Sequence, residues 1–420
     1  MKITRRSLVV GFIGILMTGR LTYAMNLLNP DCTLIRPPYD RPYGRHAHYH
    51  TNVFIETGFG FKNFNENEPV ASPLQIWQKE QDGLAMLKGF GSDSPITALS
   101  NQLNANDDGV RGHFAVQGDL DLVCAAALTT RFFFLRDWWV SVFMPIYMMK
   151  LKHVCFADLT KNNNDADYRV KTLLTDDFVS TVRTLGHLDL LGWERSGVGD
   201  LSFLVNWYRD FPQMKEVLKN ARINWRLGLS VPTGKRMDLD TLFALPFGYD
   251  GACSMPFGVG LDLMFGRFLQ AGLDVQLTHI FGHTRDYRIK TDINQTELIL
   301  LQRASAYKDY GLTQRFNLYV QMNKFYKGLS CLVGYHFVKH GRDRLALQDN
   351  TFSNYIANSA ESLREWTSHQ IFIDASYDFA VHTWDKVPVQ PYLSWYARIP
   401  FNGKRFTGSR SMGFVLAFDF

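Results

Sequence analysis

The chain has 420 residues, a net charge of +5 and a hydrophobic fraction of 46%. Its mean hydropathy is −0.15, and outside a short N-terminal run no stretch approaches the roughly 20 apolar residues that a transmembrane helix needs. These values argue against a helical membrane protein, and the dispersed charge gives little support for nucleic-acid binding. A transmembrane barrel stays compatible, because only about half of each strand faces lipid.

The N-terminus has the pattern of a secretory signal peptide. Lys2, Arg5 and Arg6 give a basic start, residues 8–17 form an apolar core, and residues 22–24 (Thr-Tyr-Ala) form a small-x-small cleavage site. A membrane anchor is the alternative, although the apolar run is short for one. We therefore predict that residues 1–24 are a signal peptide and that the chain is exported.

Two further regions follow the signal peptide. Residues 25–47 are rich in proline and aromatic residues, which predicts a periplasmic N-terminal tail or a plug that enters the barrel, and residues 48–420 are expected to form the barrel itself. His46, His48 and His50 alternate at the start of the first strand, so their imidazoles share one face. Such spacing suits a transition metal, with a hydrated rim of the lumen as the alternative reading. No cofactor is predicted.

Segments with a two-residue period recur through residues 48–420. Connections from odd to even segments are long and those from even to odd are short, which is typical of extracellular loops and periplasmic turns. Backbone groups in hydrocarbon must all be paired, so the sheet has to close. We predict an all-β fold, a transmembrane antiparallel β-barrel of about 12 strands whose long loops carry short helices. The expected strands are 50–61, 112–127, 138–152, 200–208, 223–231, 257–263, 273–278, 312–322, 329–337, 371–379, 390–398 and 410–420.

The alternation assigns a face to each side chain, and the connections predict helices. In the first strand Val53, Ile55, Phe59 and Phe61 are expected to point outward. In the second strand, Phe114, Val116, Leu120 and Leu122 are expected outward and Asp119 and Asp121 inward. Helices are expected near 73–88, from Asp176-Asp177 onward and over 352–366, with the last loop at Asn402-Gly403.

The inward positions are mainly polar or charged. They predict a hydrated passage, while the alternative is a lumen that the same charges fill by pairing with one another; a barrel of this size lies between filled barrels and open porins. The predicted lumen-lining residues are Glu56, Asp119, Asp121, Asp200, Arg226, Asp262, Asp274, Arg315, Asn317, Gln321, Asp374, Asp378 and Arg398.

The last stretch, residues 410–420, has the pattern of the closing strand of a bacterial outer-membrane barrel. Its apolar face ends in a terminal aromatic residue. A soluble sandwich strand alternates in the same way, but its place at the chain end, together with the export signal, favours the barrel. We expect this strand to pair with strands eleven and one. The residues predicted to present an assembly signal to the barrel-assembly machinery are Phe414, Leu416, Phe418 and Phe420.

Two segments resemble a known group of transporters. Residues 197–201 (Gly-Val-Gly-Asp-Leu) and residues 229–236 (Leu-Ser-Val-Pro-Thr-Gly-Lys-Arg) are similar to the GxGD and LxxPTGK segments of outer-membrane transporters related to the phenol-degradation meta-pathway and to FadL-like long-chain fatty-acid channels. In physical terms, the glycines allow a turn into the barrel and Pro232 ends a strand. The resemblance implies passive uptake of small, often apolar compounds across the outer membrane.

Two other classes of outer-membrane barrel are alternatives to a channel. An outer-membrane hydrolase needs a nucleophile within reach of a base, and the candidate fragments are Ser368-His369 and Thr278-His279. The chain has no P-loop, HExxH or GxSxG motif, so no enzyme activity is predicted. A structural or surface-adhesion barrel with a filled lumen is the main alternative to the channel.

Overall fold

The computed structural model describes residues 23–25, 49–64, 72–103, 111–135, 137–160, 165–175, 177–379 and 390–419. Nearly all of the predicted signal peptide and tail, as well as His46, His48 and Phe420, lie outside these described residues. Within the described ranges, no helix is long and apolar enough to cross a membrane.

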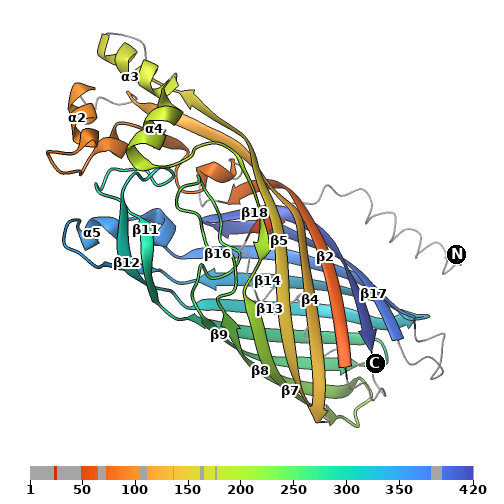
Figure 1. Ribbon diagram of the computed structural model, residues 1–420. Helices are drawn as coiled ribbons and strands as arrows, with labels where there is room; N and C mark the ends of the chain where they lie inside the picture. Colours follow the sequence, from red (N-terminus) through yellow and green to blue (C-terminus); the bar gives the residue numbers. More distant parts are fainter. Residues whose placement is uncertain are drawn as a thin grey trace, which may run out of the picture.

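Twelve antiparallel strands form a closed barrel (Figure 1). Each barrel strand pairs with the next one along the chain, and the last strand, β18, closes the ring on the first, β2, with Phe414 opposite Ile55. The predicted fold, the strand number and both neighbours of the last strand are thereby confirmed. The barrel strands are β2 (Tyr49–Phe64), β4 (His113–Leu135), β5 (Trp138–Asp158), β7 (Leu201–Pro212), β8 (Leu218–Val231), β9 (Ser254–Phe265), β10 (Leu269–Ile280), β13 (Thr313–Tyr326), β14 (Leu329–His340), β16 (Trp366–Asp378), β17 (Gln390–Lys404) and β18 (Phe406–Asp419).

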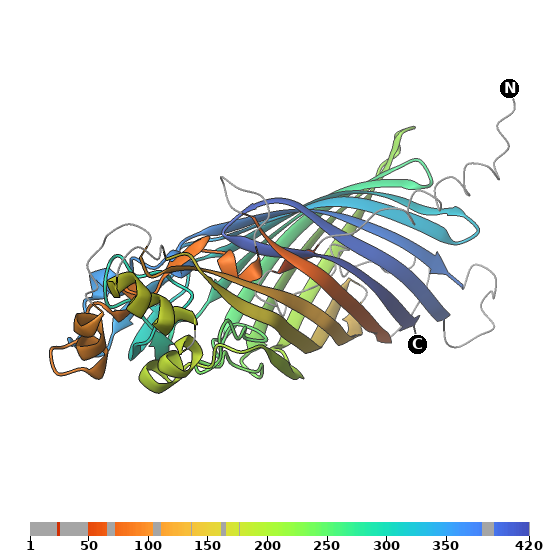
Figure 2. The same cartoon turned by 90° about the horizontal axis from the view of Figure 1, so that it is seen from above.

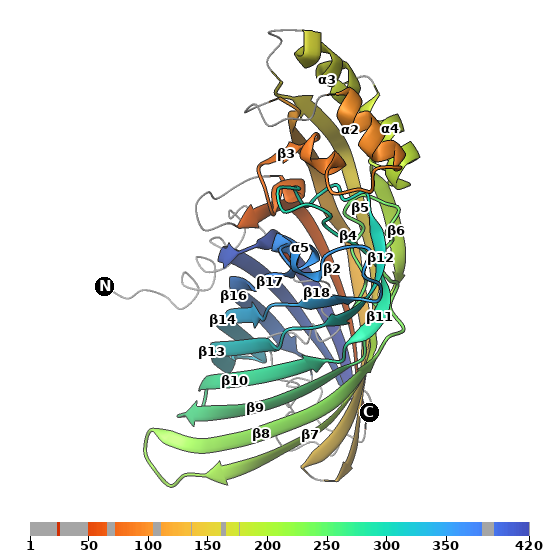
Figure 3. The same cartoon turned by 90° about the vertical axis from the view of Figure 1, so that its left-hand side faces the viewer.

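The long connections gather at one end of the barrel, which we call the mouth (Figures 2 and 3). Three short strands there form a sheet of their own, in the order β11, β12, β15, while β3 and β6 extend the edges of β4 and β5; elsewhere, β1 (Tyr23–Met25) pairs with β18. The elements of the mouth are β3 (Glu80–Asp82), β6 (Trp193–Val198), β11 (His283–Arg288), β12 (Arg303–Asp309), β15 (Arg344–Leu347), the 3₁₀ turns η1 (Pro73–Gln75), η2 (Ala85–Leu87) and η3 (Glu361–Leu363), and the helices α2 (Pro95–Gln102), α3 (Asp165–Thr175), α4 (Phe178–Gly186) and α5 (Asn354–Ala357).

The outside of the barrel is a continuous apolar belt. Every barrel strand exposes at least one large apolar side chain, from Ile55 on β2 to Phe414 on β18, which are 54% and 55% exposed. Soluble monomers rarely expose so large an apolar patch, whereas a lipid-facing barrel requires one. At the short-turn end, Trp138 and Trp225 meet edge to face with ring centroids 5.2 Å apart, as expected of an interfacial aromatic girdle.

The face assignment of the second predicted strand is wrong near the mouth. Phe114, Val116, Leu120 and Leu122 point inward and are buried, while Asp119 and Asp121 point outward. The cause is a register irregularity between Leu122 and Cys124 in the pairing with β5, which moves the alternation by one residue. This part of β4 packs against loop residues such as Leu74 and Leu87.

Phe61 on β2 was also assigned to the wrong face. It is 6% exposed and belongs to the same buried cluster as Phe114. The pairing of β2 with β18 shifts between Phe59 and Lys62, where β2 has one extra residue, so the residues beyond this point exchange faces. Val53 and Ile55 before it point outward as predicted.

The predictions for the connections are mixed. Residues 73–88 form η1, β3 and η2 instead of a helix, and 352–366 hold only α5 and η3. The helix predicted after Asp176-Asp177 is confirmed as α4, with Asp177 at its N-cap. β17 continues through Asn402-Gly403, and Arg405 alone turns the chain into β18, so the last connection at the mouth is short.

Candidate functional site

The two segments that carry the family resemblance meet at the mouth. The Asp200 carboxylate accepts hydrogen bonds from the backbone N–H groups of Gly234 at 2.9 Å and Tyr249 at 2.7 Å. The Thr233 hydroxyl donates to the Gly199 carbonyl at 3.0 Å and accepts from the Leu201 N–H at 2.9 Å. Asp200, predicted to line the lumen, is 1% exposed and holds the connection between β8 and β9 against the start of β7.

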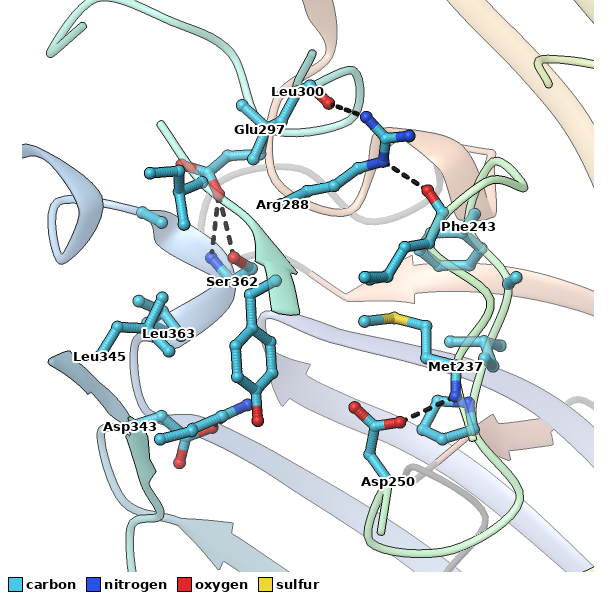
Figure 4. Close-up of a pocket in the computed structure, with 18 of the residues that line it drawn as sticks. Met237, Phe243, Asp250, Arg288, Glu297, Leu300, Asp343, Leu345, Ser362 and Leu363 are labelled. Carbon is cyan, nitrogen blue, oxygen red and sulfur yellow. Dashed lines mark hydrogen bonds and ion pairs between the residues drawn. The ribbon is translucent and has the colours of Figure 1, made fainter. Parts of the chain in front are cut away.

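A cavity of about 290 Å³ lies at the mouth, next to this connection (Figure 4). Its floor is formed by Ile280, Thr313, His340 and Trp366, which are the mouth-side ends of β10, β13, β14 and β16. The cavity therefore lies at the entrance to the barrel interior. An apolar cavity of about 150 Å³ is enough to hold benzene, so this one has room for a substituted ring.

The cavity walls are mainly apolar and come from connections far apart in the sequence. The connection between β8 and β9 provides one side, and β11, β15, η3 and the segment before β12 provide the others. Apolar pockets with a few placed polar groups are the usual form of small-molecule sites. The main apolar wall residues are Met237, Phe243, Leu245, Ile289, Leu300, Leu345 and Leu363.

One end of the cavity holds a chain of polar contacts. Asp343 Oδ2 lies 2.9 Å from Lys308 Nζ, and Asp343 Oδ1 accepts from the Gly311 N–H at 2.9 Å. His340 Nε2 lies 2.8 Å from the Asp343 carboxylate, and its Nδ1 lies 2.8 Å from the Thr313 hydroxyl. With Nε2–H donating to Asp343, Nδ1 accepts from Thr313. The order is that of a nucleophile, a base and a carboxylate, but Lys308 already neutralises the carboxylate and Thr313 is 3% exposed. We conclude that these polar contacts have a structural role and join the ends of β13 and β14.

The charges of Lys308 and Asp343 are well defined at neutral pH. Burial acts to raise the pKa of Asp343, but Lys308, together with the hydrogen bonds from His340 and Gly311, lowers that pKa below its usual range. Burial acts to lower the pKa of Lys308, and Asp343 raises it above its usual value. The two groups are therefore an ammonium and a carboxylate whose charges cancel at neutral pH.

The opposite side of the cavity is organised by Glu297 and Arg288 (Figure 4). The Glu297 carboxylate accepts from the N–H of Glu361 at 2.9 Å and from the Ser362 hydroxyl at 3.0 Å, and burial raises its pKa. Arg288 donates to the carbonyls of Leu300 at 2.7 Å and Gly186 at 2.9 Å, and burial lowers its pKa to about 10. These contacts hold the loops that form the walls.

Inside the barrel, long polar side chains lie along the wall over a glycine of the next strand. Tyr396 on β17 passes over Gly413 on β18, and its hydroxyl donates to Glu56 on β2 at 2.7 Å. Tyr319 passes over Gly272 in the same way and donates to Asp262 on β9. The missing side chain at each glycine leaves the space that the long side chain occupies.

The predicted inward residues form further pairs. Arg226 donates to both carboxylate oxygens of Asp274 at 2.7 Å and to Gln276 at 2.9 Å, and Asn317 donates to Asp274 at 3.0 Å. These side chains are at most 8% exposed. Of the predicted set, Glu56, Arg226, Asp262, Asp274, Arg315, Asn317, Gln321, Asp374, Asp378 and Arg398 have largely buried side chains in the barrel.

Asp119 and Asp121 are brought to the outer surface above the belt. Asp119 lies 2.8 Å from His153 Nδ1, and Asp121 lies 2.8 Å from Lys152 Nζ. His50 lies at the start of β2, so the predicted histidine metal site stays a prediction because its other two members are not described. Among the described residues, no group of three or more His, Cys, Asp or Glu side chains is placed to hold a metal ion.

The two fragments considered for hydrolysis do not bring a nucleophile to a base. Ser368 is buried inside the barrel, whereas the neighbouring His369 contacts the Tyr335 hydroxyl at 2.6 Å. Thr278 is likewise buried, and His279 stacks edge to face on Phe281. Neighbours in a strand point to opposite faces, which separates each pair.

The chain has similarities to known proteins at the level of solved structures. No protein-family model and no curated sequence matches the chain. Among solved structures, it is similar to an outer-membrane channel of Pseudomonas putida F1, with 10% identity, a TM-score of 0.46 and coverage of 91% of this chain and 99% of that one. The CymD monoaromatic hydrocarbon channel (9% identity, TM-score 0.32, 90% and 89% coverage) and the Ralstonia pickettii toluene transporter TbuX (12%, 0.32, 89% and 89%) also match. With TM-scores below 0.5, these similarities carry no argument about function.

Proposed function

We propose that the protein is a passive uptake channel of the bacterial outer membrane for small, mainly apolar solutes, and that it is not an enzyme. The observation that carries this proposal is the mainly apolar cavity above the barrel interior, whose floor is the ends of four barrel strands. A cavity in this position can take a solute from the outside and release it toward the interior. The apolar belt supports a place in a membrane.

The barrel interior argues for a selective channel over a general porin. At the middle of the barrel, Phe372 and Tyr396 are 0% exposed and Asp274 is 2% exposed. An open, water-filled pore would leave such inward side chains accessible. We therefore expect the solute to pass by local movement of side chains, with low steady ionic conductance.

The decisive experiment combines two measurements on the refolded, full-length protein. Planar-bilayer recordings give the ionic conductance, and stopped-flow uptake into vesicles with a lipopolysaccharide outer leaflet gives the flux of toluene and of a sugar. We expect small or brief channel openings together with accelerated uptake of toluene but not of the sugar. Equal uptake with and without the protein would favour a structural or surface-adhesion barrel.

A cavity variant tests whether the pocket lies on the route. Leu363→Trp adds bulk to an apolar wall, and we expect it to slow toluene uptake about tenfold or more while the barrel still folds. Tyr355→Trp is the matched control, because Tyr355 is 79% exposed on the neighbouring α5. Uptake unchanged by Leu363→Trp would remove the cavity from the route.

The predicted polar lining can be tested by ion selectivity. Asp374 accepts a hydrogen bond from Ser394, and Asp378 lies 2.7 Å from Lys324 Nζ. If these carboxylates line the conductive path, replacing both with Asn lowers the preference for cations in the same recordings. Unchanged selectivity would place the path elsewhere.

Two proposals concern biogenesis. We propose that residues 1–24 are removed on export, which the mass of the mature N-terminus tests. We also propose that the last strand presents Phe414, Leu416, Phe418 and Phe420 to the barrel-assembly machinery; the first two are exposed on β18. Deleting Phe420 should lower the amount of heat-modifiable barrel in the outer membrane severalfold. Normal assembly would contradict this role.

A further inference from the structure

The polar end of the cavity contains two tyrosine hydroxyls whose hydrogen bonding is incomplete among the described residues. Tyr287 on β11 is 6% exposed, and Tyr310 lies just before β13; both line the cavity. Apart from each other, neither hydroxyl has a hydrogen-bond partner among the described residues. Burial raises the pKa of both phenols, so both keep their protons at neutral pH. A buried hydroxyl without a partner costs free energy, which a ligand at this site can restore.

The charges around these hydroxyls determine what such a ligand can be. Lys308 Nζ lies 4.7 Å from the centre of the Tyr310 ring and 5.9 Å from that of Tyr287. Its positive charge is already matched by the Asp343 carboxylate 2.9 Å away. A ligand carboxylate placed at the hydroxyls would add a second negative charge near Asp343 without gaining an uncompensated cation.

We infer that the cavity selects a neutral, mainly apolar molecule with one oxygen atom, such as a phenol, an alcohol or a ketone, whose oxygen is held between the hydroxyls of Tyr287 and Tyr310. The inference rests on the proposed function and specifies its substrate class. The apolar part of the molecule lies against Leu345 and Leu363, which line the same cavity. An oxygen-free hydrocarbon fills the apolar part but leaves the two hydroxyls unsatisfied.

Three probes of equal ring size separate the possibilities: toluene, 4-methylphenol and 4-methylbenzoate. Binding to the full-length protein in lipid nanodiscs is measured by calorimetry, with empty nanodiscs subtracted for partitioning into lipid. We expect 4-methylphenol to bind about three- to tenfold more tightly than toluene, and 4-methylbenzoate to bind most weakly. Equal affinities of toluene and 4-methylphenol, or tightest binding of the benzoate, would overturn the inference.

Two conservative variants test the residues. Tyr287→Phe and Tyr310→Phe each remove only a hydroxyl, and we expect each to weaken 4-methylphenol binding about three- to tenfold while toluene binding changes less than about twofold. Tyr307→Phe is the matched control on β12, because Tyr307 is 42% exposed and does not line this cavity. If the variants change both probes equally, the hydroxyls are structural and the inference fails.

Failure of the inference and failure of the proposed function are distinguishable. If toluene and 4-methylphenol both bind the wild type but without preference, the cavity remains an apolar uptake site and only the oxygen selectivity is wrong. If neither probe binds, the proposed function itself loses its support. The comparison of probes uses the wild-type protein, so it holds even where a variant fails to refold.

Discussion

The Tyr396 hydroxyl on β17 donates a hydrogen bond to the Glu56 carboxylate on β2 at 2.7 Å, although β18 lies between these two strands. The contact is possible because Gly413 on the intervening strand has no side chain, and Tyr319 reaches Asp262 over Gly272 in the same way. Both tyrosines therefore lie along the barrel wall. The arrangement satisfies buried carboxylates and keeps two large rings off the barrel axis.

Gly272→Ala is expected to displace the ring of Tyr319 from the wall. A Cβ at Gly272 would come within 2.5 Å of Asp262 Oδ1 and even closer to the Tyr319 side chain, so the ring has to move and its bond to Asp262 is lost. We expect unfolding in urea to show a loss of about 1–3 kcal/mol, with slower toluene uptake. Adding Tyr319→Leu should restore uptake, and Gly91→Ala, where a Cβ meets open space, is the control.

Asp274→Ala is expected to destabilise the barrel more than any surface charge change. It leaves the Arg226 guanidinium, whose side chain is 6% exposed, without its bidentate partner. Breaking a buried pair in this way costs about 3–5 kcal/mol, measurable as the free energy of unfolding in lipid vesicles. Replacing both residues, as Arg226→Met with Asp274→Leu, should recover most of the loss.

The exposed counterpart is the pair of Lys150 and Glu194, which lie 2.6 Å apart and whose side chains are 38% and 53% exposed. Lys150→Met removes a screened pair partner, so we expect a loss of at most about 1 kcal/mol. A loss as large as that of Asp274→Ala would mean that burial does not determine the strength of these pairs.

The barrel itself was predictable because lipid outside and polar groups inside impose a strict two-residue period. On β13, Phe316 and Leu318 face outward and Asn317 and Gln321 inward, as the alternation predicts. The prediction failed where a register irregularity near Cys124 on β4 shifted the period, which no composition signal marks. Above the belt, polar side chains point outward and apolar side chains point inward, so an apolar residue there no longer indicates the lipid-facing side.

The cavity could not be predicted in the same way. Tyr287 and Lys308 come from the connection between β10 and β13, whereas Asp343 comes from the connection between β14 and β16, and only the fold brings them together. The sequence carried one signal for this region, the resemblance of residues 197–201 and 229–236. These two segments do contact each other through Asp200 and Thr233, but they support the wall of the mouth and leave the choice of ligand to other residues.

Ligand binding at the cavity is expected to be insensitive to pH over a wide range. The folded pKa of Asp343 is lowered, so the stability it contributes is present above about pH 4 and is lost as the pH falls through the lowered value. The folded pKa of Lys308 is raised, so its contribution is complete below about pH 10 and is lost as the pH rises through the raised value. We therefore expect 4-methylphenol affinity to vary less than about twofold between pH 5 and 9. Asp343→Asn should weaken binding across this window, and a transition near pH 7 would contradict the pair.

Arg288 is expected to hold the walls of the cavity together. Its guanidinium donates to the carbonyls of Leu300 at 2.7 Å, of Gly186, the last residue of α4, at 2.9 Å, and of His187, the C-cap of that helix, at 3.2 Å. A lysine ammonium is a point donor that cannot reach all three carbonyls. We therefore expect Arg288→Lys to lower the free energy of local opening of these connections by about 1.5–3 kcal/mol. Hydrogen exchange of residues 232–253 and 297–301 should then rise by one to two orders of magnitude, since about 1.4 kcal/mol corresponds to a factor of ten.

The control for this change is Arg183→Lys on the same helix. Arg183 is 55% exposed and pairs with Asp189 at 3.0 Å, so we expect exchange to change by less than about fivefold. If Arg288→Lys opens the loops, 4-methylphenol affinity should fall with it, because the apolar walls then lose their fixed positions. Faster exchange with unchanged affinity would show that the ligand is held by the polar end alone, at Tyr287 and Tyr310.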